Sequence, residues 1–136
     1  MGADIEVQKA IRARLVASPA VTALVPATGI VDSHQRPAPR PGIILGESQL
    51  RDEGTSLQRA HTRVWHTLHI WKREPSLEGV KAISAAVRGA LRGDRLSLGG
   101  GYHLGDLRVS DGRSMRDPDG ETSHAVLTVE CLVVEP

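Results

Sequence analysis

Residues 62–91 read Thr62-Arg-Val-Trp-His-Thr-Leu-His-Ile-Trp-Lys-Arg-Glu-Pro-Ser-Leu-Glu-Gly-Val-Lys-Ala-Ile-Ser-Ala-Ala-Val-Arg-Gly-Ala-Leu91, and this stretch decides the fold. Up to Trp71 the side chains alternate in character, and β-branched and aromatic residues are frequent. A period of two with this composition predicts an extended strand. One face of that strand is expected to hold Val64, His66, Leu68 and Ile70, and the other to hold Arg63, Trp65, Thr67, His69 and Trp71.

The second part of the stretch predicts an amphipathic helix. Pro75 ends the strand because it has no N–H to donate to a neighbouring strand. Ser76 is placed to cap a helix, and Glu78 brings a carboxylate to the positive first turn. Apolar residues then recur at spacings of three and four, at Val80, Ile83, Val87 and Leu91. A strand followed at once by a helix with one apolar stripe is the central unit of the fold.

The residues before this unit predict a helix, a short strand and a connector. Residues 4–17 carry an apolar helical stripe, and Ser18-Pro19 starts a second short helix, where proline is tolerated at the first position. Residues 29–32 are consistent with a short strand. The proline-rich segment 36–41 predicts an extended, polyproline-like connector. A surface contact made by its arginines is the alternative.

The segment between this connector and the central unit contains the candidate functional residues. Residues 42–50 start as an apolar run and then turn polar, which predicts a strand buried on both faces at its first end. Residues 51–61 then form a long polar loop between two antiparallel strands. Loops of about this length in a compact domain are usually functional or disordered. We therefore expect an assembly contact at Arg51, Asp52, Glu53, Thr55, Leu57, Gln58, Arg59 and His61.

The last third of the chain predicts a β-hairpin. Gly93 is a candidate left-handed end for the central helix, and residues 99–101 read as a turn, since no Lys-Ser/Thr pair follows to make a phosphate loop. A strand follows from about residue 102 to residue 109 and forms the first arm of the hairpin, with Met115 left open as a further member. Asp117-Pro-Asp-Gly120 is a strong turn signal, and the returning strand covers residues 123–134. One of its faces is expected to hold Leu127, Val129, Cys131 and Val133, and the other Val126, Thr128, Glu130, Leu132 and Val134.

These elements predict a single α+β domain over residues 1–136. Its mostly antiparallel sheet is expected to pack against the N-terminal helix and the central helix. The 136 residues suffice for one hydrophobic core, and we find no internal repeat or dividing linker. Because phenylalanine is absent and aromatic residues make up only 2% of the chain, the core must be built from aliphatic side chains.

Composition excludes several classes of function. The net charge of +1 does not predict tight binding to nucleic acid or to an acidic partner, and few aromatic rings are available to stack on bases. The single Cys131 rules out a disulfide framework within the chain and favours a reducing compartment. No run approaches the ~18 apolar residues of a membrane span. We therefore expect a protein that is not in a membrane and is made in a cytoplasm.

The histidines and carboxylates do not assemble into a recognisable catalytic or metal site. His66 and His69 are the closest pair, but their odd spacing sends them to opposite faces of a strand. His66 is expected to be half-buried and hydrogen-bonded. The nucleophile motif Gly-x-Ser-x-Gly is absent. The sequence thus predicts neither an enzyme nor a cofactor or metal site.

The order of the segments resembles a known family. The helix ending in Ala20-Val-Thr-Ala-Leu-Val25 is followed by Gly42-Ile-Ile-Leu-Gly-Glu47, His66-Thr-Leu-His-Ile-Trp-Lys-Arg73 and the helix Val80–Leu91. Arg116-Asp-Pro-Asp-Gly120 and Ser123-His-Ala-Val-Leu-Thr-Val-Glu130 complete the series. In this order and over nearly the whole chain, the sequence resembles the tail terminator, or tail completion, proteins of long-tailed bacteriophages and gene transfer agents. The last strand departs from the family in lacking phenylalanine, which bears on core packing.

The resemblance implies a structural protein of a virion or phage-like particle, assembled in the cytoplasm of the bacterial host. Such a protein forms a homohexameric ring at the head-proximal end of the tail. The ring stops polymerisation of the tail tube protein and joins the tail to the head-side connector, with DNA only passing through its lumen. The alternatives are another neck component, such as a stopper or adaptor, and a small enzyme or ligand-binding domain. The last would require a deep pocket with convergent polar groups.

Overall fold

The computed structural model describes residues 2–32 and 41–136. The predicted connector at residues 36–41 therefore lies almost wholly outside the described residues. The elements are α1 (Ala3–Ala17), α2 (Pro19–Thr22), the 3₁₀ turn η1 (Ala27–Gly29), β1 (Ile30–Val31), β2 (Gly42–Asp52), β3 (His61–Arg73), α3 (Glu78–Arg92), β4 (His103–Arg116) and β5 (Thr122–Val134). The predicted α+β class is confirmed, including the helix started by Pro19 with Ser18 as its cap.

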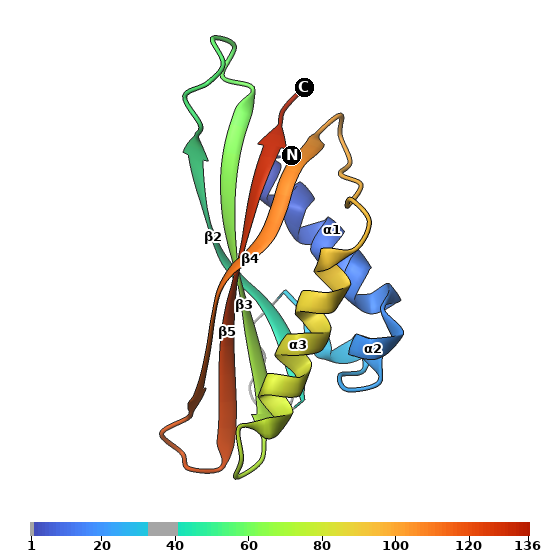
Figure 1. Ribbon diagram of the computed structural model, residues 1–136, viewed down its shortest axis with the longest axis vertical. Helices are drawn as coiled ribbons and strands as arrows, with labels where there is room; N and C mark the ends of the chain where they lie inside the picture. The colour runs from blue at the N-terminus through green and yellow to red at the C-terminus, as the bar shows by residue number, and fades with distance from the viewer. Residues whose placement is uncertain (1, 33–40) are drawn as a thin grey trace.

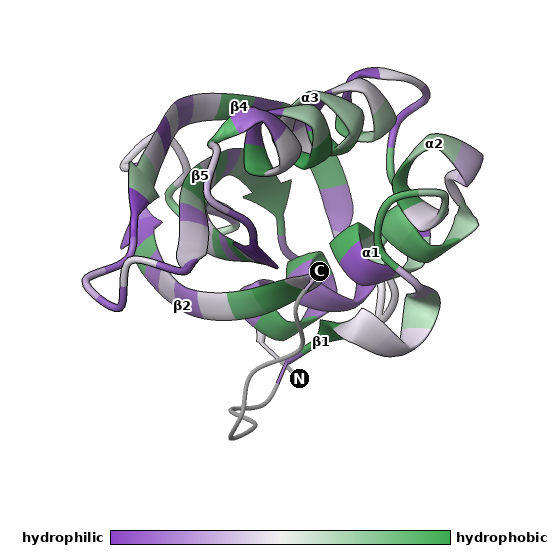
Figure 2. Ribbon diagram, turned by 90° about the horizontal axis from the view of Figure 1, so that it is seen from below, coloured by the Kyte–Doolittle hydropathy of each residue, from purple (hydrophilic) through white to green (hydrophobic). Residues whose placement is uncertain are grey.

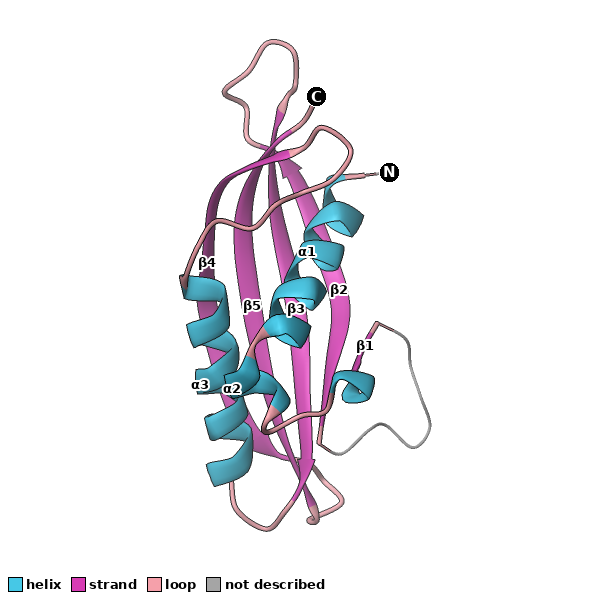
Figure 3. Ribbon diagram, turned by 90° about the vertical axis from the view of Figure 1, so that its right-hand side faces the viewer, coloured by secondary structure: helices cyan, strands magenta, loops and turns pink. Residues whose placement is uncertain are grey.

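The five strands form one sheet in the order β1-β2-β3-β5-β4 (Figure 3). β1 is parallel to β2, and the other neighbouring pairs are antiparallel. β3 lies at the centre and pairs along its whole length with β5, from His61 opposite Val134 to Arg73 opposite Thr122. Residues 62–91 thus supply both most of the central strand and, directly after it, the helix that covers it.

The helices lie on one side of the curved sheet, and the opposite side has no helix over it among the described residues (Figures 1 and 2). The alternation predicted for β3 is confirmed, because Val64, His66, Leu68 and Ile70 are buried, whereas the alternate residues from Arg63 to Trp71 are only partly buried. From the helices, the predicted stripes of α1 and α3 fill the same core, with Ile11 and Ile83 buried. Side chains on the outward face of β3 and β5 remain available for polar contacts.

β2 changes character along its length. Ile43, Ile44 and Leu45 are buried, as the apolar run predicted, and Ile43 and Ile44 also face β1. The register with β3 then shifts between Leu45 and Ser48, so the strand contains a bulge there. A bulge adds a residue to one strand and increases the local twist. Beyond it β2 is exposed and continues to Asp52, two residues farther than the sequence indicated.

Two predictions about α3 need correction or refinement. Leu77 takes the N-cap position, although the Ser76 hydroxyl still accepts a hydrogen bond from the Glu78 N–H at 3.0 Å. Gly93 was expected to end the helix in a left-handed conformation, and this is wrong. Its φ of −75° and ψ of −135° are not left-handed, because the chain returns at once to the core, where Leu96 is buried.

His66 is also different from the prediction. The residue is 1% exposed rather than half-buried, and neither ring nitrogen has a hydrogen-bond partner among residues 2–32 and 41–136. Alternation placed it on the inner face, but the residues packed around it offer neither nitrogen a partner. Burial lowers the pKa of His66, so the ring is held neutral. Cys131 is fully buried as expected, and burial raises the pKa of its thiol to about 12.

Two opposite ends of the sheet differ in what they carry. The loop between β2 and β3 and the two ends of the described chain lie at one end (Figure 1). The turn between β4 and β5 lies at the other end, with Gly120 at a φ of 74°. None of the described helices is long and apolar enough to cross a membrane.

Candidate assembly surface

The predicted contact segment 51–61 is a short projection flanked by strand residues. Arg51 and Asp52 belong to β2, and His61 belongs to β3. The loop itself is residues 53–60, and it extends past the end of the sheet (Figure 1). The structure therefore places all eight predicted residues at one end of the molecule, three of them in the strands that support the loop.

Asp52 fixes the start of the loop. Its carboxylate accepts a hydrogen bond from the Gly54 N–H at 2.8 Å and forms an ion pair with Arg59 at 3.1 Å. The Gly54 hydrogen bond, followed by the Arg59 contact, holds the pKa of Asp52 below its usual range. Arg59 has a φ of 56°, which is uncommon for a residue other than glycine. Asp52 thus stabilises a tight return of the chain.

Further polar contacts close the base of the loop. The Glu53 N–H donates to the His61 carbonyl at 2.9 Å, and the Thr55 hydroxyl lies 2.8 Å from His61 Nδ1. On the other side, the Glu135 N–H donates to the Ala60 carbonyl at 2.7 Å. These contacts define the path of the loop from both of its ends.

The tip of the loop presents an apolar side chain to solvent. Leu57 is 97% exposed, while every other large hydrophobic side chain among residues 2–32 and 41–136 is at most 48% exposed. Gln58 beside it is exposed as well. One exposed leucine is not unusual in itself. A leucine held out on a loop whose base is fixed by hydrogen bonds is, however, suited to inserting into a partner.

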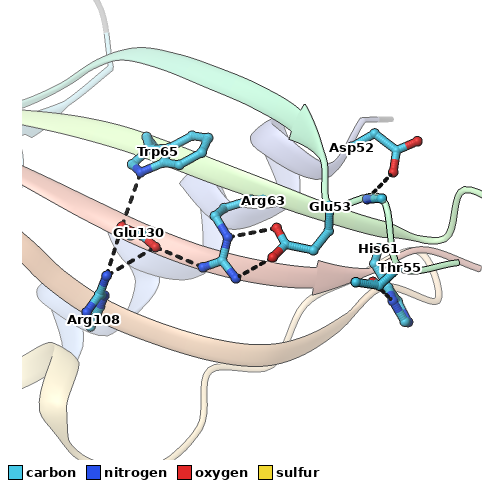
Figure 4. A network of polar contacts seen from close by, with 9 residues as sticks. Asp52, Glu53, Thr55, His61, Arg63, Trp65, Arg108 and Glu130 are labelled. Carbon is cyan, nitrogen blue, oxygen red and sulfur yellow. Dashed lines mark hydrogen bonds and ion pairs between the residues drawn. The ribbon is translucent and has the colours of Figure 1, made fainter.

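A polar network on the outward face of the sheet connects this loop to the strands (Figure 4). Arg63 of β3 binds both carboxylate oxygens of Glu53, at 2.8 and 3.0 Å, and also binds Glu130 of β5 at 2.8 Å. The hydrogen bonds from Arg63 lower the pKa of Glu53, and those from Glu53 raise the pKa of Arg63. A bidentate guanidinium–carboxylate pair fixes orientation as well as distance.

Sequence reasoning missed Glu130 as the centre of this network. Its carboxylate accepts from the Trp65 indole at 3.2 Å and lies 3.4 Å from Arg108 of β4. The guanidinium carbon of Arg51, in β2, lies over the Trp65 ring, 5.3 Å from its centroid. The available signal was alternation, which placed Arg63, Trp65 and Glu130 on outward faces, but pairing β3 with β5 was needed to bring them together.

A second polar row lies farther along the same face. His69 contacts Glu47 at 2.9 Å and His124 at 3.0 Å, and the His124 ring stacks on Trp71 at 3.7 Å between centroids. The hydrogen bond from His69 lowers the pKa of Glu47, and burial lowers that of His124. The prediction that His66 and His69 face opposite ways is confirmed. This row connects β2, β3 and β5 across the outward face.

The described residues contain no group of three or more His, Cys, Asp or Glu side chains able to hold a metal ion. The hollows on the surface are open. One of them, of about 460 Å³, lies on the outward face between β2 and β3 and is lined partly by Arg51, Trp65 and Thr67. This arrangement suits contact with another protein surface.

Both edges of the sheet offer unpaired backbone groups. β4 pairs only with β5, so its other side is free along all of His103–Arg116 among the described residues. On the opposite edge, β1 pairs only with Ile43 and Ile44, which leaves β2 free from Gly46 to Asp52 within the described part of the chain. Free edges are ready templates for pairing with another chain.

Comparison with known proteins gives one family. Residues 9–134 match the family model described as tail completion protein gp17. A search of curated proteins found no match.

Two solved structures have a similar fold. A chain from the virion of a native gene transfer agent particle is 23% identical, with a TM-score of 0.80 and coverage of 94% of each chain. The gp17 protein of bacteriophage SPP1 is 20% identical, with a TM-score of 0.60, and the match covers 95% of this chain and 89% of that one. At these identities the two structures establish a shared fold.

Proposed function

Because the chain belongs to the tail completion protein gp17 family, whose members are structural proteins of phage tails and not enzymes, we propose that it forms a ring that completes the tail. The ring contains six copies and sits at the head-proximal end of the tail. It stops polymerisation of the tail tube protein and joins the tail to the head-side connector. DNA passes through its lumen.

The observation that carries this proposal is the extent of the family match. Residues 9–134 run from the middle of α1 to the end of β5, so the match spans the whole sheet and α3. A match of this extent concerns the complete fold. The similar chain in a gene transfer agent particle is consistent with a role in a particle of this kind.

The surfaces suited to neighbours within the ring are separate from the surface suited to a protein stacked on the ring. The free edges of β2 and β4 lie on opposite sides of the sheet and suit neighbours within a ring. The loop 53–60 instead projects past one end of the strands and suits a protein stacked on the ring (Figure 1). We assign Leu57 and the residues around it to the stacked partner.

Particles made without this chain test the proposal. Electron micrographs should show overlong tails or tails without heads, and supplying the chain should restore normal particles. In complete particles the chain should be present in six copies at the head-proximal end of the tail. A copy number that increases with tail length would instead identify a tube subunit.

A head-side stopper or adaptor is the main alternative, and a binding experiment separates the two roles. Purified chain is mixed with isolated tail tubes that lack heads. Binding at one end of the tubes supports the tail completion role. Binding to isolated heads and not to tubes would assign the chain to the head side of the neck.

A further inference from the structure

The two free edges of the sheet carry different charge. α3, β4 and the residues between them, 78–116, contain seven basic and four acidic side chains. The free part of β2 with its loop, residues 46–60, contains two basic and three acidic side chains. The nearly neutral chain therefore has a basic edge and a weakly acidic edge on opposite sides of the sheet.

We propose that the edge formed by α3 and β4 of one copy binds the free β2 edge of the next copy, with the arginines beside β4 receiving the partner's β2 carboxylates. This inference rests on the proposed ring. It specifies which two surfaces meet between neighbouring copies. Because these surfaces differ, each copy contacts one neighbour through its α3–β4 edge and the other neighbour through its β2 edge.

The basic edge has a hollow in which such a partner fits. A hollow of about 230 Å³ lies between α3 and β4, with Leu91, Leu107 and Val109 at its apolar side. Arg88 and Arg92 stand one helical turn apart at its rim. A neighbouring hollow of about 290 Å³ extends it past Arg95 and Asp106. Together they form a groove that runs beside the free backbone of β4.

Three of the four arginines that line this groove are available for an external partner. Arg88, Arg92 and Arg95 are exposed, and they form no hydrogen bond or ion pair with any residue that the structure describes. This contrasts with Arg59, Arg63, Arg73 and Arg108, each of which binds a carboxylate within the chain. Guanidinium groups bind carboxylates well, and here three of them border one groove.

The β2 edge supplies complementary groups. Glu47 lies just past the bulge, and its side chain is 71% exposed while it contacts His69. Asp52 stands at the other end of the free segment, with its side chain 43% exposed. Between them the backbone of Ser48, Gln49 and Leu50 has a free side. An extended segment with a carboxylate at each end fits a groove lined by arginines beside an edge strand.

Two different edges that fit each other make a head-to-tail contact. Such a contact repeats from copy to copy and closes into a ring when the rotation between copies permits it. Pairing of β4 with a second β4 would instead join two basic edges, which like-charge repulsion disfavours. Charge thus favours the head-to-tail arrangement over a two-fold dimer.

Chemical crosslinking in assembled particles tests the edge assignment. Ser48→Cys places a thiol on the free part of β2, and Ser110→Cys places one on β4. Both serines are exposed, whereas Cys131 is fully buried, so the wild-type chain serves as an unreactive control. With a short bis-maleimide, the double variant should give a ladder of multiples up to the full ring, and each single variant should give monomers.

The other results distinguish failure of the edge assignment from failure of the proposed ring. Dimers from Ser110→Cys alone would show that two β4 edges meet. Six copies per particle without a ladder would preserve the ring and overturn the edge assignment. A ladder in particles with a different copy number would preserve the edge contact and overturn the six-membered ring. If the Cys variants do not enter particles, the same crosslinking is carried out on the purified chain at high concentration. A ladder from the double variant would support the edge contact there, and monomers alone would contradict it.

Charge reversal tests the role of the arginines. Arg88→Glu combined with Arg92→Glu, added to the double-Cys chain, should lower the yield of the ladder at least about tenfold. Lys9→Glu with Arg73→Glu makes the same change in net charge outside residues 78–116 and should leave the ladder unchanged. Equal ladders from both charge variants would exclude the groove from the contact.

Discussion

Among single residues, His66 is the clearest departure from ordinary packing. A buried ring with two unpartnered nitrogens loses hydrogen bonds to water without replacing them. Such a group costs on the order of 1–3 kcal/mol of folding free energy. The surrounding core offsets this, because β3 and β5 pair along their whole length and bury the aliphatic residues on either side.

Replacing His66 with leucine is expected to stabilise the chain and to flatten its response to acid. The folded-state pKa of His66 is lowered from 6.5 by burial, so below about pH 6.5 the unfolded chain binds the proton more readily. Stability should therefore fall as the pH decreases from 6.5 towards the folded-state pKa. Urea unfolding at pH 7.5 and pH 5 measures this difference, which should shrink in His66→Leu.

His103→Leu is the matched control, since His103 is exposed at the start of β4. It should leave the acid response of the wild type in place. A His66→Leu chain that is less stable at pH 7.5 would mean that the ring makes a favourable contact through bound water.

Arg63 lowers the pKa of Glu53. In Arg63→Met, the pKa of Glu53 should rise towards its ordinary value, because the hydrogen bonds from Arg63 are the largest cause of its lowering. Carboxyl NMR titration measures this change. Arg73→Met removes an exposed pair with Glu121 and should leave the Glu53 titration as it is. An unchanged Glu53 pKa in Arg63→Met would show that the pair does not persist in solution.

At the scale of elements, α3 packs against the core through its apolar stripe of Val80, Ile83, Val87 and Leu91. Ile83→Ala removes a side chain that is 1% exposed in the middle of this stripe. The loss of buried surface together with the cavity left behind should lower the free energy of unfolding by about 2–5 kcal/mol. Ala85 is exposed on the same helix, and Ala85→Ser should change it by less than about 0.5 kcal/mol. Urea unfolding of the two variants checks the difference, and equal stabilities would mean that α3 docks weakly.

The loop 53–60 should be dispensable for folding and needed for assembly. Deleting residues 54–59 leaves Glu53 next to Ala60 and the β2–β3 pairing from Asp52 to Thr62 intact. The purified variant should unfold at nearly the wild-type temperature, because shortening a surface loop changes the closure entropy little. It should fail to bind tail tubes. A large loss of thermal stability would place the loop in the folding core, and normal tube binding would assign the contact elsewhere.

The sequence revealed those elements whose pattern records burial. β3, β5 and α3 each bury one face. Their apolar residues therefore recur in the sequence with a period of two in the strands and of 3.6 in the helix. β4 was predicted to residue 109, with Met115 left open as a member of the same arm, because it is an edge strand whose later residues, such as Ser110 and Arg113, are exposed and carry no alternation. The bulge after Leu45 and the parallel pairing of β1 depend on distant strands, which no local pattern encodes.

The candidate surface was predicted in part for the same reason. The length and polarity of residues 51–61 pointed to the loop, and the structure places the exposed Leu57 at its tip. The network around Glu130 joins residues 67 positions apart, and it follows only once β3 pairs with β5. The groove beside β4 was missed because its arginines come from a helix, a connecting segment and a strand.

For the whole molecule, a net charge of +1 conceals an uneven distribution. One sheet edge is basic, the other is weakly acidic, and the single core between them keeps the two edges at a fixed separation. Contacts between exposed charges weaken as salt screens them, over about 8 Å at physiological ionic strength. The contact between copies should therefore weaken with added salt, while the unfolding temperature of the monomer should change little.

Light scattering and thermal unfolding across a salt series measure these two quantities separately. Self-association that strengthens with salt would indicate that the contact between copies is mainly apolar. A parallel loss of monomer stability would show instead that the edge charges support the fold.

The placement of the chain ends gives the molecule a polarity that microscopy can use. The ends and the β2–β3 loop share one pole, where the Glu135 N–H contacts Ala60, while the Asp117–Gly120 turn occupies the other (Figure 1). A bulky label fused at either end would thus crowd whatever docks on the loop, and one inserted in the turn would leave that face clear. In electron micrographs, the position of a label inserted in the turn would show whether the turn of each subunit points towards the capsid or towards the tail tip.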